Sequence, residues 1–254
     1  MNNISFLLLT RNEQDNLKGW RNWIHKLTTT NEIVVVDDES SDDTIKILKS
    51  FSSPQLTINI FTRKLNNNFS DQRNFGITKC QNDWILSLDA DEMPTPETIN
   101  YINNLSLKNG KNYSFKRNIV YLNHIISHGQ CLNDNPIKLF NKNEGKFVQP
   151  VHEIWKSLAT TVNTHQIVLH YSIKTLSVFL QKINFYSTLR AQELFDQKHH
   201  PHLWEIILYP KLKFIDLYFL KLGFLDGVPG IILSLALSFN SFLIRSKLWH
   251  LSQK

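Results

Sequence analysis

Residues 84–92, with the sequence WILSLDADE, decide the fold, because a short apolar run there leads directly into a cluster of acids. The apolar run predicts a strand that is buried on both faces, as in a parallel sheet. Residues 4–9 (ISFLLL) and 32–36 (EIVVV) have the same character, and residues 56–61 predict a further strand. The first half of the chain therefore offers four strands for one sheet.

Helical segments separate these strands. Apolar residues recur at three- and four-residue spacing over residues 17–27, and two serines can cap a helix over 44–51. Residues 71–80 also predict a helix, and two prolines open another over 97–105. Because strands that alternate with helices form βαβ units, the sequence predicts an α/β fold with a Rossmann-like, mostly parallel central sheet.

The second half of the chain has a different pattern. Beyond residue 110, short strand-like pieces alternate with turns rich in Asn and Gly, which predicts a mixed, partly antiparallel extension for an acceptor. From residue 175 the chain is helical. Pro201 and Pro210 are expected to break these helices, and the turn DGVPG at 226–230 is expected to separate the last two.

Two domains are expected from this change of pattern. The first, over residues 1–172, would hold the ligand site at the strand ends in its half at 1–108, with an acceptor-side half at 109–172. The second, over residues 173–254, would be a helical, basic, membrane-facing extension.

Composition excludes several classes of protein. A chain of 254 residues that is 42% hydrophobic can bury an ordered core. Its two cysteines form no CxxC pair or Cys/His cluster, which argues against a disulfide framework or a zinc site and favours a cytoplasmic setting. The short run at 4–9 follows no basic stretch, so we expect a first strand there and no signal peptide.

The net charge of +6 is concentrated in the tail. Residues 1–170 contain 18 basic residues (Lys and Arg) and 17 acidic residues (Asp and Glu), a net charge of +1. Residues 171–254 contain 10 basic and 5 acidic residues, a net charge of +5. Aromatic side chains interleave with these lysines, as on amphipathic helices at a lipid headgroup interface. The longest apolar run, 231–244, is expected to fall short of the roughly 20 residues that span a bilayer. We therefore expect peripheral association with the cytoplasmic surface of an inner membrane, with helix packing as the alternative, and no nucleic-acid partner.

Polar clusters follow three of the predicted strands. They are Asn12-Glu13, Asp37-Asp38 and Asp89-Ala90-Asp91. Because the carboxyl ends of parallel strands meet at one edge of a sheet, we expect these clusters to share one ligand-binding crevice.

The segment Asp89-Ala90-Asp91 predicts a metal site. In an extended chain, side chains at i and i+2 point the same way, so two carboxylates there can grip one Mg²⁺ or Mn²⁺ ion that bridges a diphosphate. The ion would neutralise charge on a leaving nucleoside diphosphate. A solvated acidic loop is the alternative. Asp38 is placed to accept hydrogen bonds from a base or ribose, whereas Asp42 and Asp43 are better explained as helix-capping residues.

Four ordered motifs resemble the family-2 glycosyltransferases of GT-A fold. They are LTRNE at 9–13, VDDESSDDT at 36–44, QRN at 72–74 and LDADE at 88–92. A later VHE at 151–153 and a GFLDG at 223–227 narrow the resemblance to the bacterial lipopolysaccharide inner-core β-glucosyltransferase group. The resemblance covers nearly the whole chain, and the order of the motifs makes it specific.

The resemblance implies an inverting, metal-dependent hexosyltransferase. It would move a sugar, in this group glucose, from a UDP-sugar to a glycan or lipid-linked glycan such as the lipopolysaccharide core. Donor contacts would come from Thr10, Asn12, Glu13, Asp38 and Arg73. Asp89 and Asp91 would hold the metal ion and the sugar-phosphate.

Two residues outside these motifs complete the expected site. Inversion needs a base for the acceptor hydroxyl, and Glu153, after a predicted strand at 146–151, is the candidate. The alternative is a glutamate that favours a helix dipole. His170 ends the apolar run 167–169 and matches a late histidine that ligates the metal in many GT-A enzymes. A strand-end histidine without function is the alternative.

Two other classes of protein compete with this interpretation. A nucleotidyltransferase would need a Gly-rich basic loop after the first strand, where this chain has TRNE at 10–13. A haloacid-dehalogenase-type phosphatase would carry its DxD on the first strand, whereas here the DxD follows the fourth. A non-catalytic membrane-surface binding protein would explain the basic tail but leave the acids at the strand ends unexplained.

Overall fold

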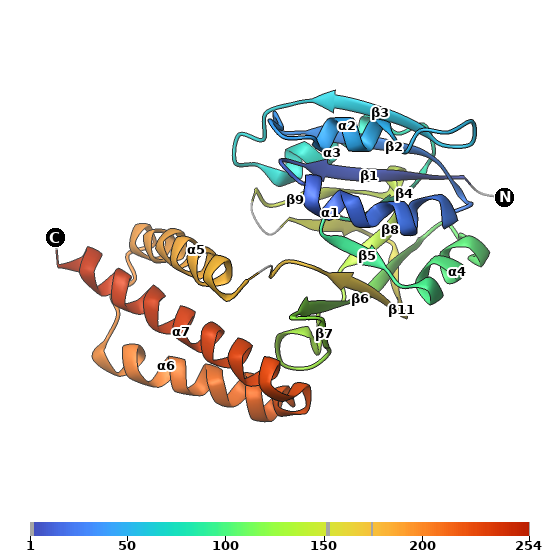
Figure 1. Cartoon of the computed structure of the whole chain (residues 1–254). Helices are drawn as coiled ribbons and strands as arrows, with labels where there is room; N and C mark the ends of the chain where they lie inside the picture. The colour runs from blue at the N-terminus through green and yellow to red at the C-terminus, as the bar shows by residue number, and fades with distance from the viewer. Residues whose placement is uncertain (1–2, 151–152, 174, 254) are drawn as a thin grey trace. The chain divides into compact units, whose positions relative to one another are not determined.

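The computed structural model describes residues 3–150, 153–173 and 175–253 (Figure 1). The chain divides into two compact units. The first comprises Met1–Arg117 and Asn135–His170, and the second comprises Asn118–Asp134 and Tyr171–Lys254. The sequence pattern did not indicate that residues 118–134 belong with the helical tail.

Four parallel strands form one half of the main sheet of the first unit. In the order β3-β2-β1-β4 they are Thr57–Thr62, Thr30–Asp37, Ile4–Thr10 and Trp84–Ser87. The central strands are buried along almost their whole length, as expected of apolar runs covered on both faces. The predicted α/β class is confirmed.

The sheet continues into strands of the second half of the chain. In the order β8-β6-β11-β5 these are Ile137–Asn141, Lys111–Tyr121, Thr160–His170 and Glu92–Pro94. Strands β4 and β8, β8 and β6, and β11 and β5 pair antiparallel. A short antiparallel pair, β9 (Gly145–Val148) and β10 (Ile154–Ser157), lies outside this sheet. This is the mixed extension that the sequence predicts.

The helices that connect the parallel strands are α1 (Gln14–Lys18), α2 (Thr44–Lys49), α3 (Phe69–Lys79) and α4 (Pro96–Asn104). Only α1 departs clearly from prediction, because two 3₁₀ turns replace the rest of the helix expected over 17–27. The reason is the packing of two bulky indoles. The rings of Trp20 and Trp23 lie 4.9 Å apart, and the Trp20 Nε1 donates to the carbonyl oxygen of Ala90 at 3.0 Å.

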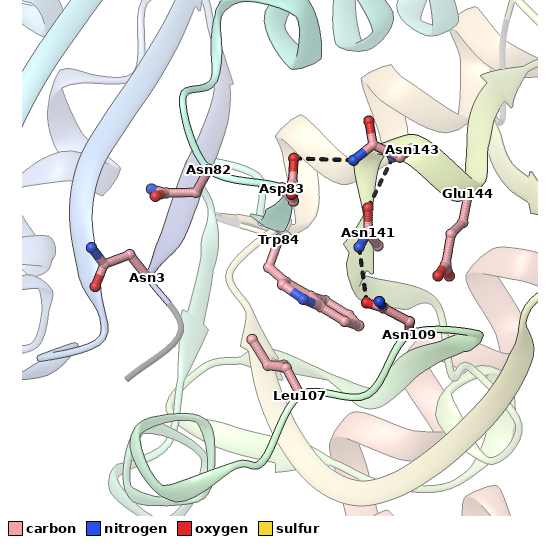
Figure 2. A pocket seen from close by; sticks show the side chains of 9 residues that line it. All are labelled: Asn3, Asn82, Asp83, Trp84, Leu107, Asn109, Asn141, Asn143 and Glu144. Atoms are coloured by element: carbon pink, nitrogen blue, oxygen red, sulfur yellow. Dashed lines mark hydrogen bonds between the residues drawn. The ribbon is translucent and has the colours of Figure 1, made fainter.

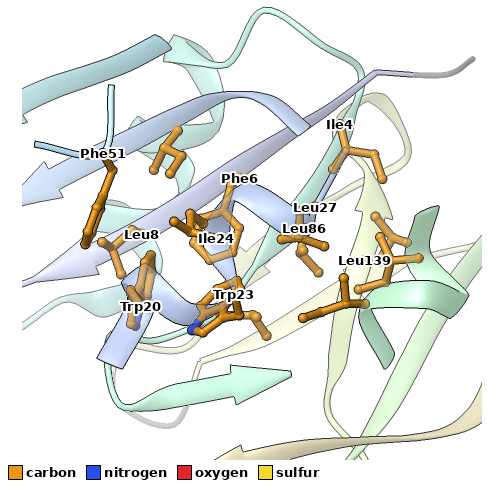
Figure 3. Close-up of a cluster of buried hydrophobic side chains, with 14 of the residues drawn as sticks. Ile4, Phe6, Leu8, Trp20, Trp23, Ile24, Leu27, Phe51, Leu86 and Leu139 are labelled. Atoms are coloured by element: carbon orange, nitrogen blue, oxygen red, sulfur yellow. The ribbon is translucent and has the colours of Figure 1, made fainter. Parts of the chain in front are cut away.

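A buried aromatic and aliphatic cluster supports the strand ends (Figure 3). Phe6 and Leu8 of β1 meet Trp20 and Ile24 from the turns, together with Leu86 of β4. Each is at most 1% exposed, so the edge of the sheet that carries the acids rests on a rigid base.

Three helices make up most of the second unit: α5 (Leu176–Asp196), α6 (Leu203–Ile215) and α7 (Gly227–Ser252). Pro201 falls between α5 and α6, as predicted. The prediction for Pro210 is wrong, because α6 continues through it. Helix α6 packs on α7 at this point, where the Ser238 Oγ donates to the Pro210 carbonyl at 2.5 Å, although the proline nitrogen itself can donate no backbone hydrogen bond.

The GFLDG stretch has a packing function within this unit. The Asp226 carboxylate accepts from the backbone N–H groups of Ser127 and His128 at 3.2 and 2.9 Å, which ties residues 118–134 to the helices. A Cβ at Gly230 would lie 2.0 Å from the carbonyl oxygen of Gly223, so only glycine fits at that crossing.

The last helix is longer than the sequence pattern indicated. Residues Gly223–Ser252 form a helical stretch that contains an 18-residue window with mean hydropathy 1.8, which by length and composition is enough to cross a membrane. The expectation that the tail falls short of this length is wrong. That expectation rests on the apolar run 231–244 alone. The helix continues beyond this run at both ends, because serine and asparagine side chains do not end a helix.

Candidate functional site

The segment 89–92 is a turn. Strand β4 ends at Ser87, and the Glu92 N–H donates to the Asp89 carbonyl at 2.9 Å, which closes the turn. The expectation of an extended chain at this segment is therefore wrong, and strand alternation does not apply to the two acids. The two carboxylates have different partners.

Asp89 belongs to a partly buried charge cluster with Arg73 and Glu153. The Arg73 Nη2 lies 2.6 Å from the Asp89 Oδ1, and its Nε lies 2.7 Å from the Glu153 Oε1. The Nη1 donates to the Ser87 Oγ at 2.9 Å. One guanidinium thus joins the candidate base to the first acid of the DxD segment, across 80 and 16 residues of sequence.

The electrostatics of this cluster keep Asp89 and Arg73 ionised. Burial alone would raise the pKa of Asp89, but the charges of Arg73 and Lys138 outweigh it and hold that pKa well below its usual range. Burial would lower the pKa of Arg73, and the two carboxylates raise it instead. Asp89 is therefore a carboxylate at every pH at which the protein would work.

The QRN motif builds this cluster. Gln72 and Arg63 exchange two hydrogen bonds, at 2.6 and 2.5 Å, which holds the start of α3. The Asn74 amide donates to the Phe147 carbonyl and accepts from the Phe147 N–H, both at 2.9 Å. Because Phe147 lies on β9, which pairs with β10, this clamp brings Glu153 to Arg73.

Asp91 is paired with His170. The His170 Nε2 lies 3.2 Å from the Asp91 Oδ2. The pairing follows from the sheet, since β11 runs antiparallel to β5 and places His170 opposite Glu92, next to Asp91 in the chain.

This pair fits two protein ligands of a divalent ion. Two neighbouring ligands of an octahedral ion, each at about 2.1 Å, lie about 3 Å apart. In the described part of the chain no group of three or more His, Cys, Asp or Glu is arranged for a metal, so substrate phosphates and water would complete the shell. An imidazole ligand favours Mn²⁺ over Mg²⁺. The shortest ion pair of Asp89 is the one with Arg73.

Three charged residues that the sequence analysis did not single out support the turn. Glu92 is fully buried, and its carboxylate pairs with Lys138 at 2.5 Å and Arg117 at 3.3 Å while accepting from the Asp89 N–H at 3.1 Å. Lys138 also lies 3.7 Å from the Asp89 Oδ2. A lysine inside the apolar strand IKLF at 137–140 was the available signal, because such a charge is buried only when paired.

Lys138→Met is expected to lower the free energy of unfolding by about 3–5 kcal/mol, since it removes one partner of a fully buried carboxylate. Urea denaturation followed by circular dichroism measures this. Lys18→Met is the matched control: its ion pair with Asp15 is exposed, and the change should stay within about 1 kcal/mol. Equal stability of the two variants would contradict the structural importance of the Glu92 pair.

The expected nucleoside contacts lie at the ends of β1 and β2. The Asp38 carboxylate is nearly buried and accepts from the Leu65 N–H at 2.9 Å and the Arg11 Nη1 at 2.8 Å. The Asp38 N–H donates to the Thr10 carbonyl at 2.9 Å, whereas the Thr10 hydroxyl is buried without a hydrogen-bond partner among the described residues. The ends of the two strands are thus in contact.

Asn12 and Glu13 join the loops that follow these strands. Asn12 has a left-handed backbone (φ 54°), and its side-chain oxygen accepts from the Ser41 N–H at 2.8 Å. The Glu13 N–H donates to the Thr44 Oγ1 at 2.8 Å, and its carboxylate accepts from the Asn16 amide at 2.6 Å. In the structure both residues position the two loops against each other.

A separate cavity of about 720 Å³ opens near the start of β1 and β4, at the opposite end of these strands (Figure 2). Its lining is rich in asparagine and includes Asp83 and Glu144. It contains none of the expected site residues. Val151 and His152 of the VHE motif lie outside the described residues, so the structure locates only Glu153 of the three.

Comparison with known proteins points to the same family as the motifs. Residues 5–123 match the family model described as Glycosyl transferase family 2. An uncharacterised glycosyltransferase of Rickettsia typhi is 26% identical, covering 100% of this chain and 89% of its own. The lipopolysaccharide core biosynthesis glycosyltransferase LpsC of Rhizobium meliloti is 23% identical, and the alignment covers 89% of this chain and 85% of LpsC. Among solved structures, S. aureus TarS 1–349 in complex with UDP-GlcNAc aligns at 14% identity with TM-score 0.48, covering 99% of this chain and 92% of that one.

Proposed function

We propose that this chain, whose residues 5–123 match glycosyl transferase family 2, is an inverting, metal-assisted hexosyltransferase. It takes a sugar from a UDP-sugar and transfers it to a cell-envelope glycan. The observation that carries the proposal is the cluster in which Arg73 contacts both Glu153 and Asp89 at the end of β4. The candidate base and the first acid of the DxD segment thus share one guanidinium.

Glu153 is proposed as the catalytic base. Its carboxylate accepts the proton of the acceptor hydroxyl, the acceptor oxygen bonds to the anomeric carbon, and the bond from that carbon to the diphosphate breaks with UDP as the leaving group. Arg73 orients the base through the 2.7 Å contact, and Asn74 holds β9, which pairs with the strand β10 that follows Glu153. Inversion follows because attack and departure occur on opposite faces of the sugar.

Asp91 and His170 are proposed as the protein ligands of Mn²⁺ or Mg²⁺, supported by their 3.2 Å separation. When bound, the ion neutralises charge on the departing diphosphate. Asp89, Arg73 and Lys138 would orient the donor sugar and its phosphate beside it, and Asp38, Thr10, Asn12 and Glu13 would line the nucleoside end.

The lipopolysaccharide core is the proposed acceptor, and glucose the proposed sugar. The support is the similarity to LpsC, whose name describes core biosynthesis, together with the motif resemblance. Acceptors of this kind are carried on lipid, so we place the enzyme at the cytoplasmic surface of the inner membrane, to which its basic tail is attracted.

A screen of UDP-sugars with Mn²⁺ tests the proposal. We expect one UDP-sugar, UDP-glucose first, to be hydrolysed slowly without acceptor and transferred with core oligosaccharide, and EDTA to abolish both reactions. Calorimetry should show that UDP binds with Mn²⁺ at least tenfold more tightly than ATP does. Tight metal-independent binding of ATP, with no UDP-sugar turned over, would contradict the proposal.

A further inference from the structure

The second unit reverses the usual distribution of side chains between core and surface. Of the 29 exposed large hydrophobic side chains among the described residues, 24 lie between Leu176 and Trp249 and five lie elsewhere. A water-soluble domain rarely exposes so large an apolar surface in one place. The described residues of the first unit expose three such side chains, Phe69, Ile154 and Leu158, so the contrast is internal to one chain.

The interior of this helical unit is made largely of small and polar residues. The buried positions of α7 are Pro229, Gly230, Leu233, Ser234, Ala236, Ser238 and Leu248, and those of α5 are Ile183, Ser187 and Ala191. Helix α7 packs against both α5 and α6 (Figure 1) through this face. Small residues inside and large apolar residues outside are typical of helices that pack within lipid.

The charges of α7 are turned inward and hydrogen-bonded. The Lys247 ammonium donates to the Asn184 carbonyl, the Ser187 Oγ and the Thr188 Oγ1 of α5 at 2.6, 2.7 and 2.8 Å. The Arg245 guanidinium lies 3.8 Å from the centre of the Tyr209 ring. Between Asp226 and Arg245 the helix carries no charge over 18 residues, a length of about 27 Å, close to that of a hydrocarbon layer.

We infer that the α5–α7 unit is embedded in the acyl region of a bilayer, with Leu235, Phe239 and Phe242 among the side chains in contact with lipid chains. This goes beyond electrostatic attachment, and it does not depend on the donor site proposed above. The occupant is lipid because the excess of positive charge in residues 171–254 complements anionic headgroups and opposes pairing with a second copy. A dimer would also cover one patch, whereas the exposed residues lie on all three helices.

Membrane fractionation of the full-length protein is the first test. We expect the protein to stay with membranes in 1 M NaCl and in carbonate at pH 11, and to leave them only with detergent. Complete release by salt would overturn the inference and leave a peripheral protein.

Tryptophan fluorescence gives a second readout. The indoles of the first unit are at least 93% buried, whereas Trp204 and Trp249 are about half exposed. Vesicles of phosphatidylcholine and phosphatidylglycerol with acyl-brominated chains should therefore quench fluorescence from the tail. The double variant Trp204→Phe/Trp249→Phe should lose this quenching, and its absence in the unsubstituted protein would contradict lipid contact.

A matched pair of triple variants locates the surface. Leu235→Gln/Phe239→Gln/Phe242→Gln should lower vesicle partitioning at least about 100-fold, because three large apolar groups lose their lipid contacts. Phe69→Gln/Ile154→Gln/Leu158→Gln, exposed on the first unit, should leave it unchanged. A stable lipid-free dimer that only the α7 variant converts to monomer would assign the surface to a second copy and overturn the inference.

Discussion

Glu153→Gln is expected to lower the rate of sugar transfer by about 10²- to 10⁴-fold while the Kd for the UDP-sugar stays within about threefold. An amide cannot accept the hydroxyl proton, but its oxygen can still accept from the Arg73 Nε at the 2.7 Å position. The cluster that faces the donor therefore keeps its geometry. Release of UDP measures transfer, and calorimetry measures donor binding.

Glu144→Gln is the matched control for this experiment. Glu144 lines the cavity at the other end of the strands (Figure 2) and should not affect the rate. Transfer by Glu153→Gln at the rate of the unsubstituted protein would remove Glu153 as the base. A loss of donor binding equal to the loss of rate would instead make Glu153 a donor-binding residue.

Asp91→Ala is expected to weaken Mn²⁺-dependent UDP binding by at least about 100-fold and to make the remaining binding insensitive to EDTA. The side chain is partly exposed and contacts His170, so the fold should survive its removal. Calorimetry with Mn²⁺ and UDP measures the effect, and thermal unfolding checks the fold.

His170→Ala should show the same loss of metal dependence, because the proposed ion needs both members of the pair. Asp83→Ala, an exposed acid at the opposite end of β4, is the control and should bind UDP as tightly as the unsubstituted protein. Normal, EDTA-sensitive binding by Asp91→Ala would show that the metal assignment is wrong.

Sequence motifs identify Arg73, Asp89 and Glu153 as candidate site residues but do not predict that the three are in contact. Each residue could be singled out from its own motif, because an acid at a strand end or a charged residue in QRN stands out locally. Their contacts could not be predicted, since the ion pairs join residues 16 and 80 positions apart. The Asn74 clamp on β9 that makes the second contact leaves no periodic signal in the sequence.

The turn at 89–92 and the burial of Glu92 are local features that the sequence motif did not predict. The spacing of the DxD segment predicts an extended chain, whereas the Glu92 N–H closes a turn on Asp89. In that turn the two carboxylates form different ion pairs, Asp89 with Arg73 and Asp91 with His170. Local sequence does not decide this, because the pairing of Glu92 with Lys138 comes from a strand 46 residues away.

The sequence by itself determined the α/β class, the four parallel strands and the edge at which the acids gather, because apolar periodicity and strand-end position are local properties. Only the tertiary structure decided which charges meet, that the DxD carboxylates have separate partners, and that the tail helices carry their large apolar side chains outward. These features depend on contacts between distant segments. Packing and the pairing of buried charges select such contacts, and neither leaves a pattern within one stretch of chain.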